Sequence, residues 1–209
     1  MSPVSRLHAG STALVLFDFL KGHIRTGDPA TETRYAPVVA NAVRLMTLAR
    51  SVDMMIAYTN GAHRPDNATS GVTLRDTDNR LRPLGDSEAR RFVPAVHAST
   101  SQAEVIDELA PRASDYIVPK YRWSAFYQTY LDLALRARGV RTIVLAGGST
   151  DVGIASTAFA ARDMDYSIVI VSDACTSPET DNHEQLMRRV FPRMSRVRTT
   201  LEVESLLGA

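Results

Sequence analysis

The stretch that decides the fold is "TIVLAGGSTDVGIASTAFAARDM", residues 142–164. An apolar run passes through two glycines and three small polar residues into a segment with helical periodicity, which indicates a buried strand followed by a helix. The N–H groups at the start of such a helix form a site for an anion. Gly153 lies inside the predicted helix, where glycine costs about 1 kcal/mol relative to alanine. Its presence therefore predicts that something needs the space beside it.

The same alternation of apolar runs and helical segments extends along the whole chain. Apolar runs predict strands at 12–17, 54–59, 115–119, 142–147 and 167–172, with a weaker sixth at 196–200. Helical periodicity fills 36–52, 101–110, 127–139, 151–164 and 181–191. Strands that alternate with helices predict a parallel sheet covered on both faces. We therefore expect residues 1–209 to form a single-domain, three-layer α/β/α fold around a six-stranded, mostly parallel sheet. The long polar stretch 60–100 is expected to be a functional loop.

Composition limits the partners of the protein. The 209 residues include 24 Lys and Arg against 23 Asp and Glu, a net charge of +1, which favours neither nucleic acid nor an anionic membrane. The single cysteine, Cys175, excludes an intrachain disulfide. No apolar run approaches the roughly 20 residues that span a bilayer, and no signal sequence is evident. We expect a cytoplasmic protein with a small-molecule substrate, no cofactor and no metal.

Ligands of open parallel sheets bind beyond the carboxyl ends of the strands. Asp18 ends the first strand, where a low dielectric suits a general acid or base, although a turn or helix-cap Asp fits equally well. Lys120 follows the third strand, where it would hold Asp18 ionised or bind a substrate carboxylate; the alternative is a surface lysine. It is one of only two lysines in the chain, the other being Lys21, and this favours a specific role.

The remaining candidates follow the other strands. Gly148, Ser149 and Thr150 would place N–H groups around an oxyanion, or would form an ordinary helix cap. The two hydroxyls have no evident base to make them nucleophiles. Further candidate contacts to an anionic substrate are Phe19, Asn60, His63, Arg64, Arg122 and Trp123, with a solvated loop as the alternative for His63 and Arg64. No metal-ligand spacing is present. Cys175 has no base placed to activate it and is predicted to be a small buried residue.

The order of these motifs resembles that of the isochorismatase-like, or cysteine hydrolase, superfamily over roughly residues 10–207. The resemblance rests on Asp18, on "KYRWSAF" (120–126), on "GSTDVG" (148–153), and on "SDAC" (172–175) with the downstream His183. It implies a six-stranded parallel sheet, a homodimer or homotetramer, and a cis peptide near Gly148–Ser149. Most members are amidases with an Asp–Lys–Cys triad, which implies triad roles for Asp18 and Lys120.

At the position of the family's nucleophilic cysteine this chain has Gly153. Isochorismatases proper resemble it in having glycine there and a "KWRYSAF" segment, and they hydrolyse a vinyl ether without a side-chain nucleophile. The resemblance therefore implies that Asp18 acts as the acid and that Gly153 leaves room for substrate or water. Two alternatives are a C–N hydrolase with another nucleophile or an activated water, and a non-catalytic protein that binds a small acid.

Overall fold

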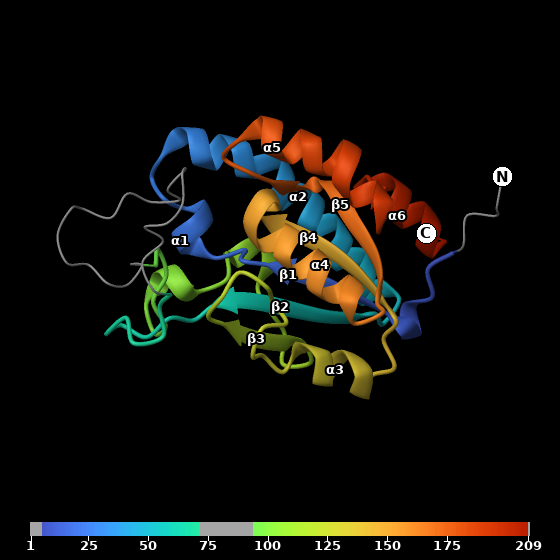
Figure 1. Ribbon diagram of the computed structural model, residues 1–209, viewed down its shortest axis with the longest axis horizontal. Helices are drawn as coiled ribbons and strands as arrows, with labels where there is room; N and C mark the ends of the chain where they lie inside the picture. Colours follow the sequence, from blue (N-terminus) through green and yellow to red (C-terminus); the bar gives the residue numbers. More distant parts are fainter. Residues whose placement is uncertain (1–5, 72–93, 209) are drawn as a thin grey trace.

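The computed structural model describes residues 6–71 and 94–208. Its centre is one six-stranded sheet with the order β3-β2-β1-β4-β5-β6, and every neighbouring pair is parallel. The strands are β1 (Thr12–Phe17), β2 (Met55–Gly61), β3 (Tyr116–Lys120), β4 (Thr142–Gly148), β5 (Ser167–Thr176) and β6 (Arg196–Arg198). All six predicted strands are confirmed, including the weakest, β6. Figure 1 labels the first five.

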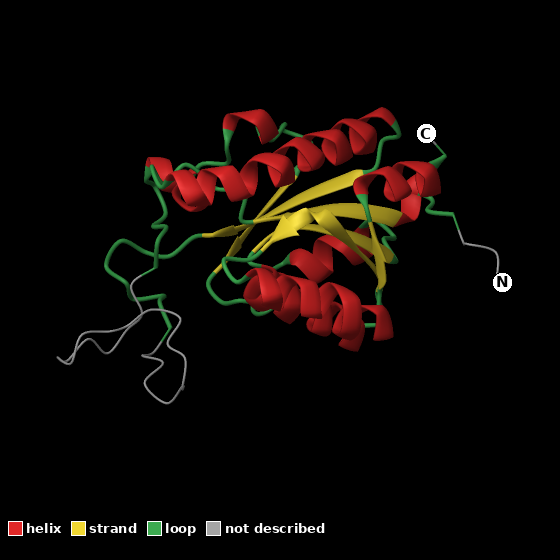
Figure 2. Ribbon diagram, turned by 90° about the horizontal axis from the view of Figure 1, so that it is seen from above, coloured by secondary structure: helices red, strands yellow, loops and turns green. Residues whose placement is uncertain are grey.

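Helices cover both faces of the sheet, as Figure 2 shows. They are α1 (Lys21–Ile24), α2 (Pro29–Ser51), α3 (Leu131–Ala137), α4 (Ala155–Asp163), α5 (Thr180–Gln185) and α6 (Thr200–Leu207). Helices α2 and α6 bury apolar side chains in one core and α3 and α4 in the other. The predicted three-layer fold is therefore confirmed. No helix in the described part of the chain combines the length and the apolar character needed to cross a bilayer.

The alternation along β1 explains how one strand serves two cores. Leu14 and Leu16 pack in the core beneath α2 and α6, whereas Ala13, Val15 and Phe17 pack in the core beneath α3 and α4. Because successive side chains of a strand point to opposite faces, a continuously apolar strand is what a doubly covered sheet requires. All six residues of β1 are buried.

The helix predicted over 101–110 is wrong. This segment forms two short 3-10 turns, Ser101–Ala103 and Asp107–Leu109, with an extended stretch between them. Val105 forms an antiparallel bridge with Leu20, and Ile106 N–H donates to the carbonyl of Phe19. The Glu104 carboxylate, three residues after Ser101 as in a helix capping box, accepts a hydrogen bond from Lys21 instead. Pairing with the segment after β1 therefore replaces the local helix.

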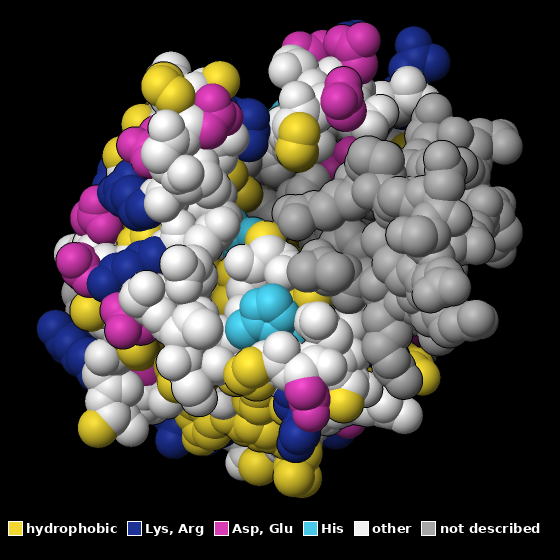
Figure 3. All heavy atoms as spheres, turned by 90° about the vertical axis from the view of Figure 1, so that its left-hand side faces the viewer, with side chains coloured by type: hydrophobic (Ala, Val, Ile, Leu, Met, Phe, Trp, Pro, Cys, Tyr) yellow, Lys and Arg dark blue, Asp and Glu magenta, His cyan; other side chains and the backbone are white. Residues whose placement is uncertain are grey.

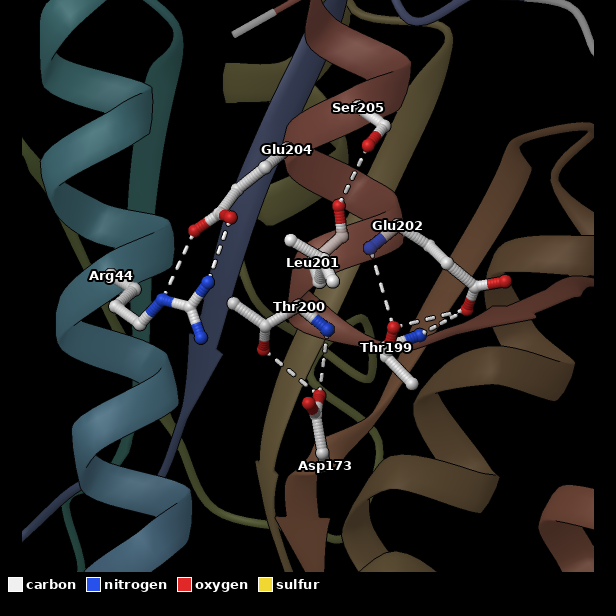
Figure 4. Close-up of polar contacts among 8 residues, drawn as sticks. All are labelled: Arg44, Asp173, Thr199, Thr200, Leu201, Glu202, Glu204 and Ser205. Atoms are coloured by element: carbon white, nitrogen blue, oxygen red, sulfur yellow. Dashed lines mark hydrogen bonds and ion pairs between the residues drawn. The ribbon is translucent and has the colours of Figure 1, made fainter.

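Helix α6 was not predicted from the sequence, and tertiary contacts explain it (Figure 4). Thr199 and Glu202 form a reciprocal capping box at its start. Asp173, at the end region of β5, accepts hydrogen bonds from both N–H and Oγ1 of Thr200 at 2.8 and 2.9 Å. Arg44 of α2 binds the Glu204 carboxylate through two nitrogens. The eight-residue helix is thus fixed at its N-terminus and along its side.

The other predicted helices differ in their bounds. The predicted helix 127–139 is shorter, since α3 covers Leu131–Ala137, and the predicted helix 181–191 begins as α5 and continues as a π-helical turn, Leu186–Val190. Helix α2 begins seven residues before the predicted segment 36–52, because Asp28 caps it and Pro29 occupies its first turn. The predicted helix 151–164 begins with a π-helical turn, Thr150–Ile154, before α4 continues it. This π-helical turn contains Thr150 and Gly153, two of the predicted site residues. Wider turns of this kind are often found at functional sites.

Candidate active site

The register of the sheet gathers the predicted residues at one edge. Phe17 of β1 lies opposite Thr59 of β2 and Gly147 of β4, and Gly61 of β2 lies opposite Lys120 of β3. The residues that follow these positions, including Asp18, therefore come together where the strands end. Figure 3 shows this face of the molecule, with histidine side chains near its middle beside a hollow.

Asp18 and Lys120 form a buried ion pair. Lys120 Nζ lies 2.6 Å from Asp18 Oδ2, and the backbone N–H of Gly61 donates to Asp18 Oδ1 at 2.8 Å. Asp18 is 8% exposed and Lys120 is 6% exposed. The alternatives of a helix-cap Asp and a surface Lys are therefore wrong, because Leu20 is the N-cap of α1 and Lys120 is buried; Asp18 does lie in the turn after β1. Ionised groups are rarely buried unless paired, so this edge holds a deliberate pair of charges.

The backbone at Asp18 fixes the direction of its carboxyl group. Its φ of 52° lies in the left-handed region, which Asp tolerates better than most residues. The N–H of Asp18 donates to the carbonyl of Thr59, and its own carbonyl accepts from Leu20 at 2.8 Å. Residues held in this region concentrate at functional sites. The break between β1 and α1 thus turns Asp18 toward Gly61 and Lys120.

The space beside Gly153 is occupied by an aromatic ring. A Cβ atom added at Gly153 would lie 2.3 Å from Cε1 and 2.4 Å from Cζ of Phe17. The sequence correctly indicates that the helix needs a residue without a side chain here. The expectation that the gap admits substrate or water is wrong, because Phe17 fills it. The same ring lies 4.3 Å from Lys120 Nζ, measured to its centroid.

Gly148 has an aromatic neighbour on the other side of the turn. A Cβ atom added there would lie 2.3 Å from Oη of Tyr35, a 7% exposed residue of α2. Burial, followed by the charge of Asp18, raises the pKa of the Tyr35 phenol to about 12, so it stays protonated at neutral pH. Sequence reasoning missed Tyr35, because it lies on an apolar helix face with no motif. The Gly148–Ser149 peptide is cis, as the resemblance implies.

Asp151 organises a polar cluster at the same turn. Its carboxylate accepts hydrogen bonds from Ser149 Oγ, from Ser177 Oγ at 2.6 Å and from Asn182 Nδ2 at 2.8 Å. Burial raises the pKa of this carboxyl, but the three donors outweigh it and the pKa falls below its usual value. Asn182 belongs to α5, which buries no side chain of its own, so this hydrogen bond helps to attach α5 to the turn.

Thr150 has a histidine partner that the sequence did not reveal. Its Oγ1 lies 2.9 Å from Nδ1 of His183 on α5, and Thr150 itself is fully buried. Burial lowers the pKa of His183, so the imidazole is largely neutral at pH 7 and can accept the hydroxyl proton. Contrary to the prediction, the Thr150 hydroxyl therefore has a base within hydrogen-bond distance.

The end of β2 carries buried polar atoms without partners. Among the described residues, Thr59 Oγ1, Asn60 Oδ1 and His63 Nδ1 have negligible exposure and no hydrogen-bond partner. Burial, together with the charge of Lys120, lowers the pKa of His63, which keeps its ring largely neutral at pH 7. Buried polar atoms are normally satisfied, and exceptions concentrate at sites that bind a ligand or water.

Other predicted contacts are placed elsewhere. Arg64 is exposed and binds Asp66 through Nε and Nη2, so its guanidinium is already engaged within the loop. Arg122 Nη1 donates to the carbonyls of Thr69 and Tyr121. Phe19 is 1% exposed and packs in the core beneath α2, which leaves it no surface for a substrate.

Two further predicted residues differ in exposure. Trp123, a candidate substrate contact, is 51% exposed. Cys175 is 4% exposed, and burial raises the pKa of its thiol to about 12. The prediction that Cys175 is a buried structural residue is confirmed. Within the described ranges, no group of three or more His, Cys, Asp or Glu side chains is arranged to hold a metal ion.

The sequence matches the family model of the isochorismatase domain over residues 12–202. The chain belongs to the isochorismatase family. The match includes both Asp18 and Lys120, the π-helical turn and His183. Members of this family are hydrolases, and the chain is therefore a hydrolase of the isochorismatase family.

Relatives within the isochorismatase family carry different names. The chain is 42% identical to the isochorismatase family protein YecD of Escherichia coli over 97% of this chain and 98% of that protein. It is 30% identical to the phenazine biosynthesis protein PhzD1 of Pseudomonas aeruginosa, covering 84% of this chain and 77% of that protein. It is 29% identical to the maleamate amidohydrolase of Pseudomonas putida, covering 82% and 75%.

A solved structure agrees with this assignment. The cysteine hydrolase from Pseudomonas syringae superposes with a TM-score of 0.81 and 26% identity, covering 100% of this chain and 99% of that one. The family thus includes proteins named amidohydrolases and cysteine hydrolases. The type of bond that this isochorismatase-family chain hydrolyses must be argued from its own site.

Proposed function

We propose that the protein hydrolyses a vinyl ether in a small carboxylate substrate, the isochorismatase type of reaction. The observation that carries this proposal is a buried Asp18–Lys120 ion pair at the same edge as Gly153. Gly153 supplies no nucleophilic side chain, and the ring of Phe17 fills the space where one would lie. Covalent catalysis needs a nucleophile with an activating base. Vinyl-ether hydrolysis needs only a positioned acid and a water molecule.

The proposed steps use Asp18 as the proton carrier. Asp18 first takes a proton from the Lys120 ammonium group, whose Nζ lies 2.6 Å from Asp18 Oδ2, and passes it to the terminal vinyl carbon, so that the ether-bearing carbon becomes an oxocarbenium ion. Water adds to that carbon and loses a proton to Lys120, which restores the ion pair. The bond between the hemiketal carbon and the ether oxygen then breaks; the hemiketal hydroxyl proton passes to that oxygen, which leaves as an alcohol, and pyruvate is released. Atoms and charge balance without an oxidant or a metal.

The neighbouring groups support binding in this scheme. Lys120 holds Asp18 in place and adds positive charge for the substrate carboxylate. The backbone N–H groups of Gly148, Ser149 and Thr150 lie at the start of the π-helical turn, where they would bind an anion. The unpartnered Asn60 Oδ1 and His63 Nδ1 would hydrogen-bond the substrate or the attacking water.

The direct test is turnover of isochorismate, followed by pyruvate release. We expect wild-type protein to release pyruvate and Asp18→Asn to lose at least about 100-fold in kcat, the usual contribution of general acid catalysis. Cys175→Ala is the control and should keep its activity. Pyruvate release that depends on Cys175 and not on Asp18, or no release by folded wild-type protein, would contradict the proposal.

A C–N hydrolase is the second candidate, because Thr150 Oγ1 lies 2.9 Å from His183 Nδ1. This pair has the geometry of a hydroxyl and its base. The complete burial of Thr150 counts against it, since a nucleophile must reach its substrate. Mass spectrometry during turnover of maleamate would show an acyl adduct on wild type and none on Thr150→Val. No adduct and no amide turnover would remove this candidate.

We also propose that the protein forms a homodimer or homotetramer in the cytoplasm. Ile117 of the edge strand β3 is 43% exposed, and Trp123, Tyr127 and Leu133 nearby are 51%, 54% and 70% exposed. Exposed apolar side chains this close in sequence favour an interface. Analytical ultracentrifugation tests this, and Leu133→Glu should shift the protein toward monomers. A monomer at micromolar concentration would contradict it.

A further inference from the structure

The ring of Phe17 cannot easily leave the space beside Gly153. Phe17 is the last residue of β1, and it is paired in register with Thr59 on one side and Gly147 on the other. A Cβ atom added at Gly147 would lie 2.1 Å from the carbonyl oxygen of Phe17, so the two backbones are in close contact. The Phe17 side chain is 2% exposed and packs in the core. The sheet thus fixes the backbone of Phe17, and the packing of the core surrounds its side chain.

The same ring has a charged neighbour. Lys120 Nζ lies 4.3 Å from the ring centroid, within the range of a cation–π contact. The ammonium group therefore has the Asp18 carboxylate as one neighbour and the Phe17 ring as another. Gly153 and Lys120, which are 33 positions apart in the sequence, both border the volume of one aromatic side chain.

We propose that Phe17 is the specificity-determining residue that restricts this site to hydrolysis without a nucleophile at position 153. Its ring takes the volume that a side chain at 153 would need, and it closes that side of the Asp18–Lys120 pair to water and substrate. Phe17 and Gly153 therefore act as a matched pair, and replacement of Gly153 alone cannot create a reactive side chain. This inference concerns the space of the site whatever the substrate, so it does not depend on the proposed reaction.

The first test measures the clash by thermal unfolding. Gly153→Ala adds a single methyl group, which in a helix ordinarily stabilises. Here we expect Tm to fall by roughly 3–10 °C, because the methyl group overlaps the Phe17 ring. Gly10→Ala is the matched control, since a Cβ atom there has nothing within 4 Å. In a Phe17→Val background, Gly153→Ala should no longer lower Tm relative to Phe17→Val alone.

The second test asks whether trimming the ring opens the position to chemistry. Wild-type protein, whose only thiol is the buried Cys175, sets the background for alkylation by iodoacetamide. Gly153→Cys alone should react slowly or unfold at a lower temperature. Phe17→Val/Gly153→Cys should react faster, with a pH midpoint below about 8.5 because Lys120 favours the thiolate.

Three results would overturn the proposal. The first is that Gly153→Ala has the same Tm as Gly10→Ala. The second is that Gly153→Ala changes Tm by the same amount with Phe17 and with Phe17→Val. The third is that the Gly153→Cys thiol reacts equally fast with Phe17 and with Phe17→Val. The first comparison needs no change at Phe17, so it holds even if Phe17→Val folds poorly. None of these measurements uses a substrate, so failure of isochorismate turnover leaves them interpretable.

Discussion

Replacement of Lys120 by methionine tests the central feature of the site. The substitution keeps an unbranched side chain and removes the ammonium group that lies 2.6 Å from Asp18 Oδ2. Removing one partner of a buried ion pair costs about 3–5 kcal/mol, because the other charge is left without compensation. Asp18 keeps the hydrogen bond from Gly61 at 2.8 Å, so we expect the loss to lie near 3 kcal/mol.

Urea unfolding followed by circular dichroism measures this loss. With a slope of about 2–3 kcal/mol/M, a change of about 3 kcal/mol moves the midpoint by roughly 1–1.5 M. The matched control is Lys21→Met, which removes the only other lysine; its ammonium pairs with Glu104 and Asp107 at the surface. We expect a far smaller change there, because solvent screens exposed ion pairs.

A double-mutant cycle separates the pair from its surroundings. Asp18→Asn leaves the Lys120 ammonium buried without its partner, whereas Asp18→Asn/Lys120→Met removes both charges of the pair. The double variant should therefore lose about 2 kcal/mol less than the sum of the two single variants. Additive losses, or a Lys120→Met variant as stable as wild type, would refute the reasoning that the two charges stabilise each other inside the protein.

Four other expectations follow from the structure. Burial lowers the pKa of His183 in the folded protein, so below pH 6.5 the unfolded protein binds more protons than the folded one. The Tm should therefore fall as the pH drops through 6.5, and it should fall less in His183→Asn. Gly148→Ala should lose about 1–3 kcal/mol in urea unfolding, and Tyr35→Phe in the same chain should restore part of it, because the added Cβ would lie 2.3 Å from the phenol oxygen. Cys175 should resist iodoacetamide at pH 8 in native protein and react after unfolding, since its thiol pKa is about 12. Thr199→Ala should cost about 1 kcal/mol, because it removes the capping box of α6; no change in the urea midpoint would contradict this.

The strands and the cover on both faces of the sheet could be predicted from the sequence, because a doubly covered parallel strand has a distinctive continuous apolar run. Helices were predicted less well where tertiary pairing overrides local preference. The segment 101–110 has helical periodicity, yet Val105 pairs with Leu20 and the local helix does not form. Helix α6 begins with the local capping box of Thr199 and Glu202, which the sequence analysis missed, and its second contact, from Thr200 to Asp173, joins residues 27 positions apart and cannot be found by local inspection.

The residues of the site could be predicted where a rule of topology applies. Asp18 follows β1 and Lys120 ends β3, the strands on either side of β2. The rule that ligands bind at the carboxyl ends of parallel strands therefore places the two residues at the same edge. His183 and Tyr35 could not be found in this way, because each lies on a helix and reaches the turn through its side chain. Arg64 shows the opposite error. It lies near the site in sequence, but its carboxylate partner is Asp66, two residues away.

The glycines of the turn show why an unfilled position in a sequence need not be an open position in space. A missing side chain at 153 suggests a vacancy for a ligand, and the sequence alone offers no means of deciding what fills it. The structure gives each glycine a partner from elsewhere in the chain: Phe17 for Gly153, and Tyr35 for Gly148. Both partners are aromatic and buried, and each extends from a regular element, so the turn lies between two packed rings. The polar groups of this edge that neither glycine position supplies include the Asp18–Lys120 pair and the unpartnered atoms at the end of β2, and the proposed reaction is built from the former.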